Sequence, residues 1–233
     1  MEATSKQTFS RSNQGFTMVE LLVAMVVAFL ALEAIYSTFL NQHRSYQIQE
    51  ETAEMQQNLR AALLYMKREI RMAGCDPIGT ADARIVKAER ILIRFAEDVR
   101  GNSPDSDPDG DADDPNEDVT YSLKGKNLVK NTGHGDYVVA QNIDAIDFVY
   151  LDGSSPPHVL NDPLIGGDVP AAKINQIRSV EVTIVARTSH PLLPSKNSRV
   201  YINQRGTKIL PPQNDHVARR RLTTWIKCRN LGI

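Results

Sequence analysis

The stretch GFTMVELLVAMVVAFLALEAIYSTFL, residues 15–40, decides how the N-terminal part of this chain folds. Residues 16–40 contain no Lys, Arg, Gly or Pro. As a helix they would be roughly 37 Å long at about 1.5 Å per residue, which exceeds the bilayer hydrocarbon core of about 30 Å. We therefore predict a membrane-spanning helix. Lys6 and Arg11 precede it, which favours a cytoplasmic N-terminus and an exported C-terminal part.

A cleaved secretory signal peptide is the alternative interpretation of this segment. Such signals have an apolar core of about 7–15 residues, followed by small residues at the cleavage site. Here the apolar run is longer, and helical periodicity continues beyond it. A helix that stays in the membrane fits the segment better.

Two carboxylates interrupt the apolar run, Glu20 near its start and Glu33 further along. A charged side chain costs about 2.5–3.5 kcal/mol at the centre of a membrane helix and less near the interface, so an ionisable residue there needs a partner. The neighbouring sequence offers Glu20 no Lys or Arg. A newly made N-terminal amino group is one candidate partner. For Glu33 the sequence leaves three roles open: reaching the interface, pairing with another chain, or staying protonated.

The residues GFTMVE, 15–20, resemble the processing site of class III prepilins, the precursors of type IV pilins and of type II secretion pseudopilins. The resemblance implies that a membrane prepilin peptidase cuts between Gly15 and Phe16 and N-methylates Phe16. Residues 1–15 would then be a basic leader. Glu20 becomes the fifth residue of the mature protein, where the family's glutamate attracts the α-amino group of a neighbouring subunit during assembly.

The helix is expected to continue from the membrane segment, residues 16–40, into an amphipathic half, residues 41–74. Apolar residues recur there at helical spacing between Gln, Glu, Arg and Lys. Gly74 is the predicted stop, after a helix from about Thr17 to Ala73. The residues of the apolar stripe are Ile48, Met55, Leu59, Leu63, Met66 and Ile70.

Residues 75–233 are predicted to form an exported, β-rich domain. Alternating apolar and polar residues predict strands over residues 84–95, 119–123, 143–151, 177–187 and 218–229. A hairpin turn is expected at KGKN, residues 124–127, before the strand-like residues NLVK. The expected fold is therefore α+β, with a long helix packed on a largely antiparallel sheet. Pilin-like proteins share this layout.

A second resemblance covers the part of the chain beyond the processing site. The segments MKREIRMAGCDPIG (66–79), VTYSLKGKNLVK (119–130) and RRRLTTWIKCRNLGI (219–233) resemble PilW-type minor pilins, and the layout is also similar to J-class pseudopilins of type II secretion. The resemblance implies a minor pilin of a type IV pilus, with other major and minor pilins and the inner membrane as partners. The expected location is the inner membrane first, then the fibre, periplasm or cell surface.

Two other functions stay open at this point. One is a J-class pseudopilin, and the other is a membrane-anchored extracellular binding domain. For a pilus, the resemblance leaves motility, adhesion and DNA uptake open.

An acidic loop, residues 104–118, separates two of the predicted strands. Its segment 105–118 holds eight acidic and no basic residues. Alternate aspartates followed by Gly110 match the opening of a calcium loop, whereas Pro108, Pro115 and the absence of flanking helices argue for a solvated loop. Calcium is therefore a candidate ligand. Its predicted ligands are Asp105, Asp107, Asp109, Asp111 and Asp113.

The two cysteines, Cys75 and Cys228, allow one intramolecular disulfide, which export would favour. Two unpaired core thiols are the alternative. A bond over so long a loop would contribute about 4–5 kcal/mol in an entropic model.

Composition and motifs point away from enzymes and nucleic-acid binders. The chain has 233 residues and a net charge of −1, so it has no overall attraction for nucleic acid. The cluster Arg219–Arg221 is expected to be a strand edge with alternating exposed arginines, and Trp225 is expected in the core. The sequence contains no G-x-S-x-G, HExxH or P-loop motif, and the histidines lack metal spacing. We expect no enzyme activity and, apart from calcium, no cofactor.

Overall fold

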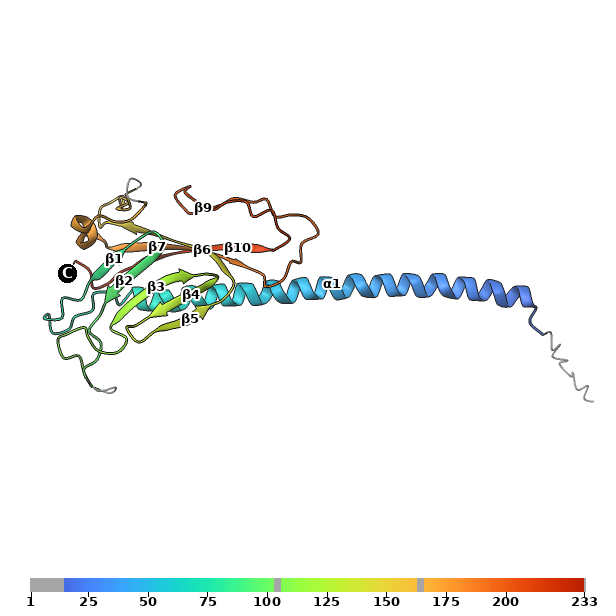
Figure 1. The fold of residues 1–233 in the computed structure, drawn as a ribbon, viewed down its shortest axis with the longest axis horizontal. Helices are drawn as coiled ribbons and strands as arrows, with labels where there is room; N and C mark the ends of the chain where they lie inside the picture. Colours follow the sequence, from blue (N-terminus) through green and yellow to red (C-terminus); the bar gives the residue numbers. More distant parts are fainter. Residues whose placement is uncertain (1–14, 103–105, 163–165, 233) are drawn as a thin grey trace, which may run out of the picture. The chain divides into compact units, whose positions relative to one another are not determined.

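The computed structural model describes residues 15–102, 106–162 and 166–232 and divides the chain into two compact units. The first is Met1–Ile48 and the second is Gln49–Ile233. Helix α1, Met18–Ile70, begins in the first unit and ends in the second. The fold is α+β, with a long helix followed by antiparallel sheets, as the sequence predicted (Figure 1).

In the second unit, the last turns of α1 supply one side of the hydrophobic core. The buried residues of this helix follow the predicted stripe: Met55, Leu59, Ala62, Leu63, Met66 and Ile70. The α-helix ends at Ile70, and a turn follows to Gly74, which has a φ of +78°. That conformation favours glycine, and a Cβ there would lie 2.4 Å from the Leu231 side chain.

A five-stranded antiparallel meander follows the helix, with the strands in sequence order. Its strands are β1 (Ile85–Ala88), β2 (Leu92–Ala96), β3 (Asp118–Lys124), β4 (Asn127–Asn131) and β5 (Asp136–Ala140). The single strand predicted over residues 84–95 is therefore wrong, because the chain turns between β1 and β2. β5 was not predicted. The acidic loop connects β2 with β3, and Figure 1 shows β3, β4 and β5 beside the C-terminal turns of α1.

A second antiparallel sheet has the order β10-β7-β6. Its strands are β6 (Ile143–Leu151), β7 (Ser179–Arg187) and β10 (Arg219–Lys227), and a 3-10 helix, η2 (Ala171–Gln176), precedes β7. A short hairpin, β8 (Tyr201–Ile202) and β9 (Lys208–Leu210), forms the third sheet and packs Tyr201 and Leu210 on Ala145 and Val185. The main core joins one face of β6, β7 and β10 to the meander and to α1.

Two predictions about β10 are wrong, although this strand does lie at an edge of its sheet. Successive side chains of a strand point to opposite faces, and Ile226 is the one in the core. Trp225 therefore faces the other way and is 53% exposed. The side chain of Arg219 is only 1% exposed, because it pairs with the buried Asp144 and with Asp215. Arg220 and Arg221 are both exposed.

Candidate functional site

The predicted processing site lies immediately before α1. Gly15 and Phe16 are non-helical, and Phe16 is 90% exposed. A Cβ added at Gly15 would meet no atom within 4 Å. Both residues of the predicted cleavage site are therefore exposed among the described residues. The rest of the predicted leader, residues 1–14, lies outside the described residues.

Glu20 has a partner in its own chain that sequence reasoning missed. The Thr17 N–H donates to Glu20 Oε2 at 2.9 Å, and the Thr17 hydroxyl donates to the same oxygen at 2.8 Å. In return, the Glu20 N–H donates to Thr17 Oγ1 at 3.2 Å. This is a capping box, in which Thr17 caps the helix and Glu20 stands three residues later. The signal was present in the sequence as T-x-x-E.

The helix that starts at this cap carries apolar side chains that are exposed all round in the first unit. Residues 15–47 are all exposed. A soluble helix buries an apolar stripe, whereas a helix that is apolar on every side is typical of a membrane span. By length and composition, α1 contains a segment able to cross a membrane.

The acidic loop brings together part of the predicted calcium set. Asp109, Asp111 and Asp114 each offer one oxygen, and these oxygens lie within 4.8 Å of one another. Among the described residues, Asp107 and Asp113 do not belong to this group, and Asp114 takes the place that the sequence assigned to Asp113. Asp105 lies outside the described residues. Burial and the Asp109 carboxylate raise the pKa of Asp114.

Glu117 braces the loop and is not one of the grouped carboxylates. Its Oε1 accepts the N–H groups of Val99, at 2.8 Å, and Arg100, at 3.0 Å. Its Oε2 accepts the N–H of Asp114 at 3.3 Å. The two oxygens of the Glu117 carboxylate therefore accept hydrogen bonds from backbone N–H groups on both sides of the loop.

The two cysteines are free thiols in the structure, so the predicted disulfide is not formed in it. Cys75 is half-buried just after the helix turn, and Cys228 is buried just after β10. Burial raises the pKa of the Cys228 thiol to about 12 and also raises that of Cys75. Both thiols therefore stay protonated and poorly reactive at neutral pH.

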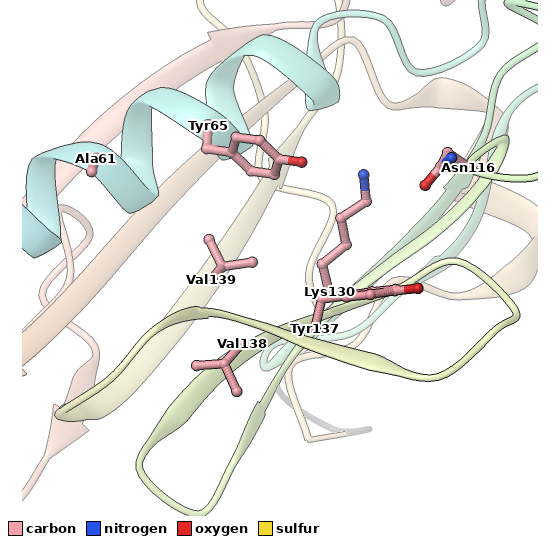
Figure 2. A pocket seen from close by; sticks show the side chains of 7 residues that line it. All are labelled: Ala61, Tyr65, Asn116, Lys130, Tyr137, Val138 and Val139. Atoms are coloured by element: carbon pink, nitrogen blue, oxygen red, sulfur yellow. The ribbon is translucent and has the colours of Figure 1, made fainter. Parts of the chain in front are cut away.

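A hollow of about 450 Å³ lies between α1 and the β4–β5 edge of the meander, and it was not predicted (Figure 2). Figure 2 shows Tyr65 and Lys130 pointing into the same space, and the Lys130 Nζ lies 5.5 Å from the centre of the Tyr65 ring. Lys130 also donates to Glu69 Oε1 at 2.7 Å, and the Tyr121 hydroxyl donates to Glu69 Oε2. The lysine charge is thus balanced by Glu69.

Glu97 lies beside this polar network and forms no ion pair among the described residues. It is 7% exposed, and its Oε2 has no hydrogen-bond partner among the described residues. Burial and the Glu69 carboxylate raise the pKa of Glu97 to about 7. Between the ordinary pKa and about pH 7, the folded state therefore binds more protons than the unfolded state, so stability falls as the pH rises.

Replacing Glu97 with Gln is expected to stabilise the protein at pH 8 by about 3 kcal/mol and to leave stability at pH 4 nearly unchanged. The reason is that glutamine removes the buried charge that forms only above the raised pKa. The measurement is the free energy of unfolding of the full chain in detergent across this pH range. The exposed Glu54, changed to Gln, is the control. An E97Q effect that does not change with pH would contradict the assignment.

Comparisons with known proteins agree with these features. Residues 10–32 match the family model of the prokaryotic N-terminal methylation motif. The fold is similar to the type IV-like pilin TTHA1219 from Thermus thermophilus, with a TM-score of 0.51 and 9% sequence identity over 77% of this chain and 100% of that one. No curated protein sequence matches the chain significantly.

The motif and the fold lead to one conclusion. A motif of this kind implies a prepilin peptidase and other pilins as partners in general, and together with the apolar helix it indicates membrane anchoring. The chain therefore combines an N-terminal methylation motif with a fold similar to that of a type IV-like pilin.

Proposed function

We propose that this protein is a PilW-like minor pilin that takes part in the assembly of a type IV pilus. The observation that carries the proposal is the arrangement at the start of α1, where an exposed Gly15–Phe16 pair is followed at once by a capped apolar helix bearing Glu20. The C-terminal segment RRRLTTWIKCRN, residues 219–230, supports the PilW-type assignment by its resemblance.

Assembly would proceed through the helix. The N-terminus of the precursor would face the cytoplasm. The peptidase would then cleave between Gly15 and Phe16 and methylate Phe16. The apolar helix then leaves the membrane for the core of a fibre or of an initiation complex, where neighbouring helices cover its exposed apolar side chains. Residues 75–233 stay outside. Priming, capping or tuning the fibre is a structural role.

Glu20 would set the register of this assembly. In the single chain its carboxylate accepts hydrogen bonds from Thr17 only, and it has no cationic partner among the described residues. A charged hydrogen bond from the amino group of a neighbouring subunit would offset the cost of holding the carboxylate in an apolar core. The amino group exists at that position only after cleavage, so processing and assembly are coupled.

Processing is tested by mass spectrometry on two fractions, sheared surface fibres and washed membranes. We expect an N-methylated peptide that begins at Phe16 in the fibres. The same peptide found only in membranes would favour a J-class pseudopilin of type II secretion. An uncleaved N-terminus in both fractions would contradict the pilin role and leave a membrane-anchored binding domain.

A further inference from the structure

The acidic loop between β2 and β3 contains a cluster of carboxylates whose spacing suits a single cation. The oxygens of Asp109, Asp111 and Asp114 lie within 4.8 Å of one another. Oxygens that bind one calcium ion at about 2.3–2.6 Å are themselves at most about 5 Å apart. Among the described residues, no Lys or Arg forms an ion pair with any of the three.

Two buried carboxyl oxygens at this cluster have no hydrogen-bond partner, which is the independent sign of a ligand. Asp114 is 8% exposed, and its Oδ2 is unpartnered among the described residues. Asp98, two residues after the end of β2, is fully buried, and its Oδ1 is unpartnered among the described residues as well. A buried carboxylate oxygen without a donor is costly, and such atoms are uncommon in folded proteins.

Asp98 lies directly behind the cluster. Its Oδ2 accepts the N–H of Gly110 at 3.1 Å, and Gly110 stands between Asp109 and Asp111 in the chain. The Asp98 carboxylate therefore adds a fourth negative charge next to the three grouped carboxylates. Their mutual repulsion destabilises the loop unless a cation balances it.

The loop backbone around Gly110 is held in place by other contacts. Thr80 Oγ1 donates to the Gly110 carbonyl at 2.7 Å, and Asn102 Nδ2 donates to Asp109 Oδ2 at 2.8 Å. Gly110 has a φ of +93°, and a Cβ there would lie 2.3 Å from Thr80 Oγ1. Only glycine fits this position, so the aspartates on either side are held close together without a bound ion.

We propose that Asp109, Asp111 and Asp114 bind one calcium ion, with Asp98 adding negative charge from behind the loop. Calcium suits the site better than magnesium, because it accepts several carboxylates in irregular geometry, whereas magnesium demands a near-ideal octahedron and keeps its waters. The ligand set shares Asp109 and Asp111 with the one that the sequence predicted. The proposal does not depend on the pilus role.

Calorimetry on the full chain in detergent tests the site, after treatment with EDTA and removal of the chelator. Titration with calcium chloride is expected to show about one ion per chain, with a Kd of about 0.1–1 mM, the range of extracellular calcium modules. Magnesium chloride should bind at least about tenfold more weakly. The absence of binding up to about 10 mM calcium would overturn the proposal.

Matched variants separate a site from a general attraction of cations to the loop. D109N and D111N should each weaken calcium binding at least about tenfold, because each removes a charged ligand. D113N is the control, since it loses the same charge from an exposed aspartate of the same loop outside the group. It should stay within about twofold of the unmodified protein. Equal losses in D111N and D113N would overturn the site.

Thermal unfolding keeps the test valid if a variant folds poorly. In EDTA, D111N should melt at or above the temperature of the unmodified protein, because it relieves repulsion between carboxylates. Saturating calcium should raise the Tm of the unmodified protein and of D113N but not that of D111N. The proposal would also be overturned if calcium did not change the Tm of the unmodified protein.

Discussion

Changing Glu20 to Gln is expected to remove the protein from assembled fibres while leaving its helix intact. Glutamine also serves at this position of a capping box, so the hydrogen bonds with Thr17 can persist. What disappears is the charge. Truncating one partner of a buried charge pair costs about 2–5 kcal/mol, which corresponds to a drop in incorporation of at least about 30-fold. The measurement is the amount of the protein in sheared fibres relative to washed membranes.

E33Q is the matched control, because it neutralises a second carboxylate of the same apolar segment that lies outside the processing signature. We expect E33Q to enter fibres at nearly the unmodified level. E20A removes both the hydrogen bonds from Thr17 to the Glu20 carboxylate and the charge, and it should behave like E20Q. Normal incorporation of E20Q together with loss of E20A would show that Glu20 acts by capping α1, and the assembly mechanism proposed above would be wrong.

Changing Arg219 to Met is expected to destabilise the second unit by about 3 kcal/mol, or roughly 6–12 °C in Tm for a unit of this size. The side chains of Arg219 and Asp144 are 1% and 0% exposed, and Arg219 Nε donates to Asp144 Oδ2. Arg219 also binds Asp215 through two hydrogen bonds of 2.6 Å each. Without the arginine, the buried Asp144 keeps only Lys126 close by and Arg187 at 3.9 Å.

Arg220 supplies the control, since it is the next residue of β10 but is exposed. R220M removes the same charge and should change the free energy of unfolding by no more than about 0.5 kcal/mol. Adding D144N to R219M should recover part of the loss, because it removes the buried carboxylate that the first change leaves under-paired. Equal effects of R219M and R220M, measured by thermal unfolding of the full chain, would contradict the buried pair.

Some elements were predictable because their signals are local. β6 spans Ile143–Leu151, the same bounds that alternation predicted, since one face enters the core and the other is covered too. The apolar stripe of α1 could also be predicted, because helical spacing of apolar residues is visible over a few turns of sequence. The strand predicted over residues 84–95 failed because the break depends on β6: the Phe148 N–H donates to the Arg90 carbonyl at 2.8 Å, and Asp147 binds the Arg90 side chain. No local pattern reports such a contact.

The candidate sites also differ in whether their signals are local in the sequence. Gly15, Phe16 and Glu20 lie within six consecutive residues, so their spacing alone predicts a processing site, and the T-x-x-E pattern of the cap lies there as well. The carboxylate cluster is different. Asp109 and Asp111 stand out in the sequence, but Asp98 lies 12 residues before Gly110, and only the fold brings its carboxylate behind the loop.

By itself, the sequence indicated an apolar helix able to cross a membrane, an N-terminal methylation motif and the α+β class, because hydrophobic periods and short motifs act over a few residues. Only the tertiary structure decided that Arg219 is buried, that Trp225 is exposed and that Asp114 joins the cluster in place of Asp113. Alternation along a strand specifies two faces but not which of them will be covered. That choice depends on the segments that pack there, and for β10 these come from distant parts of the chain.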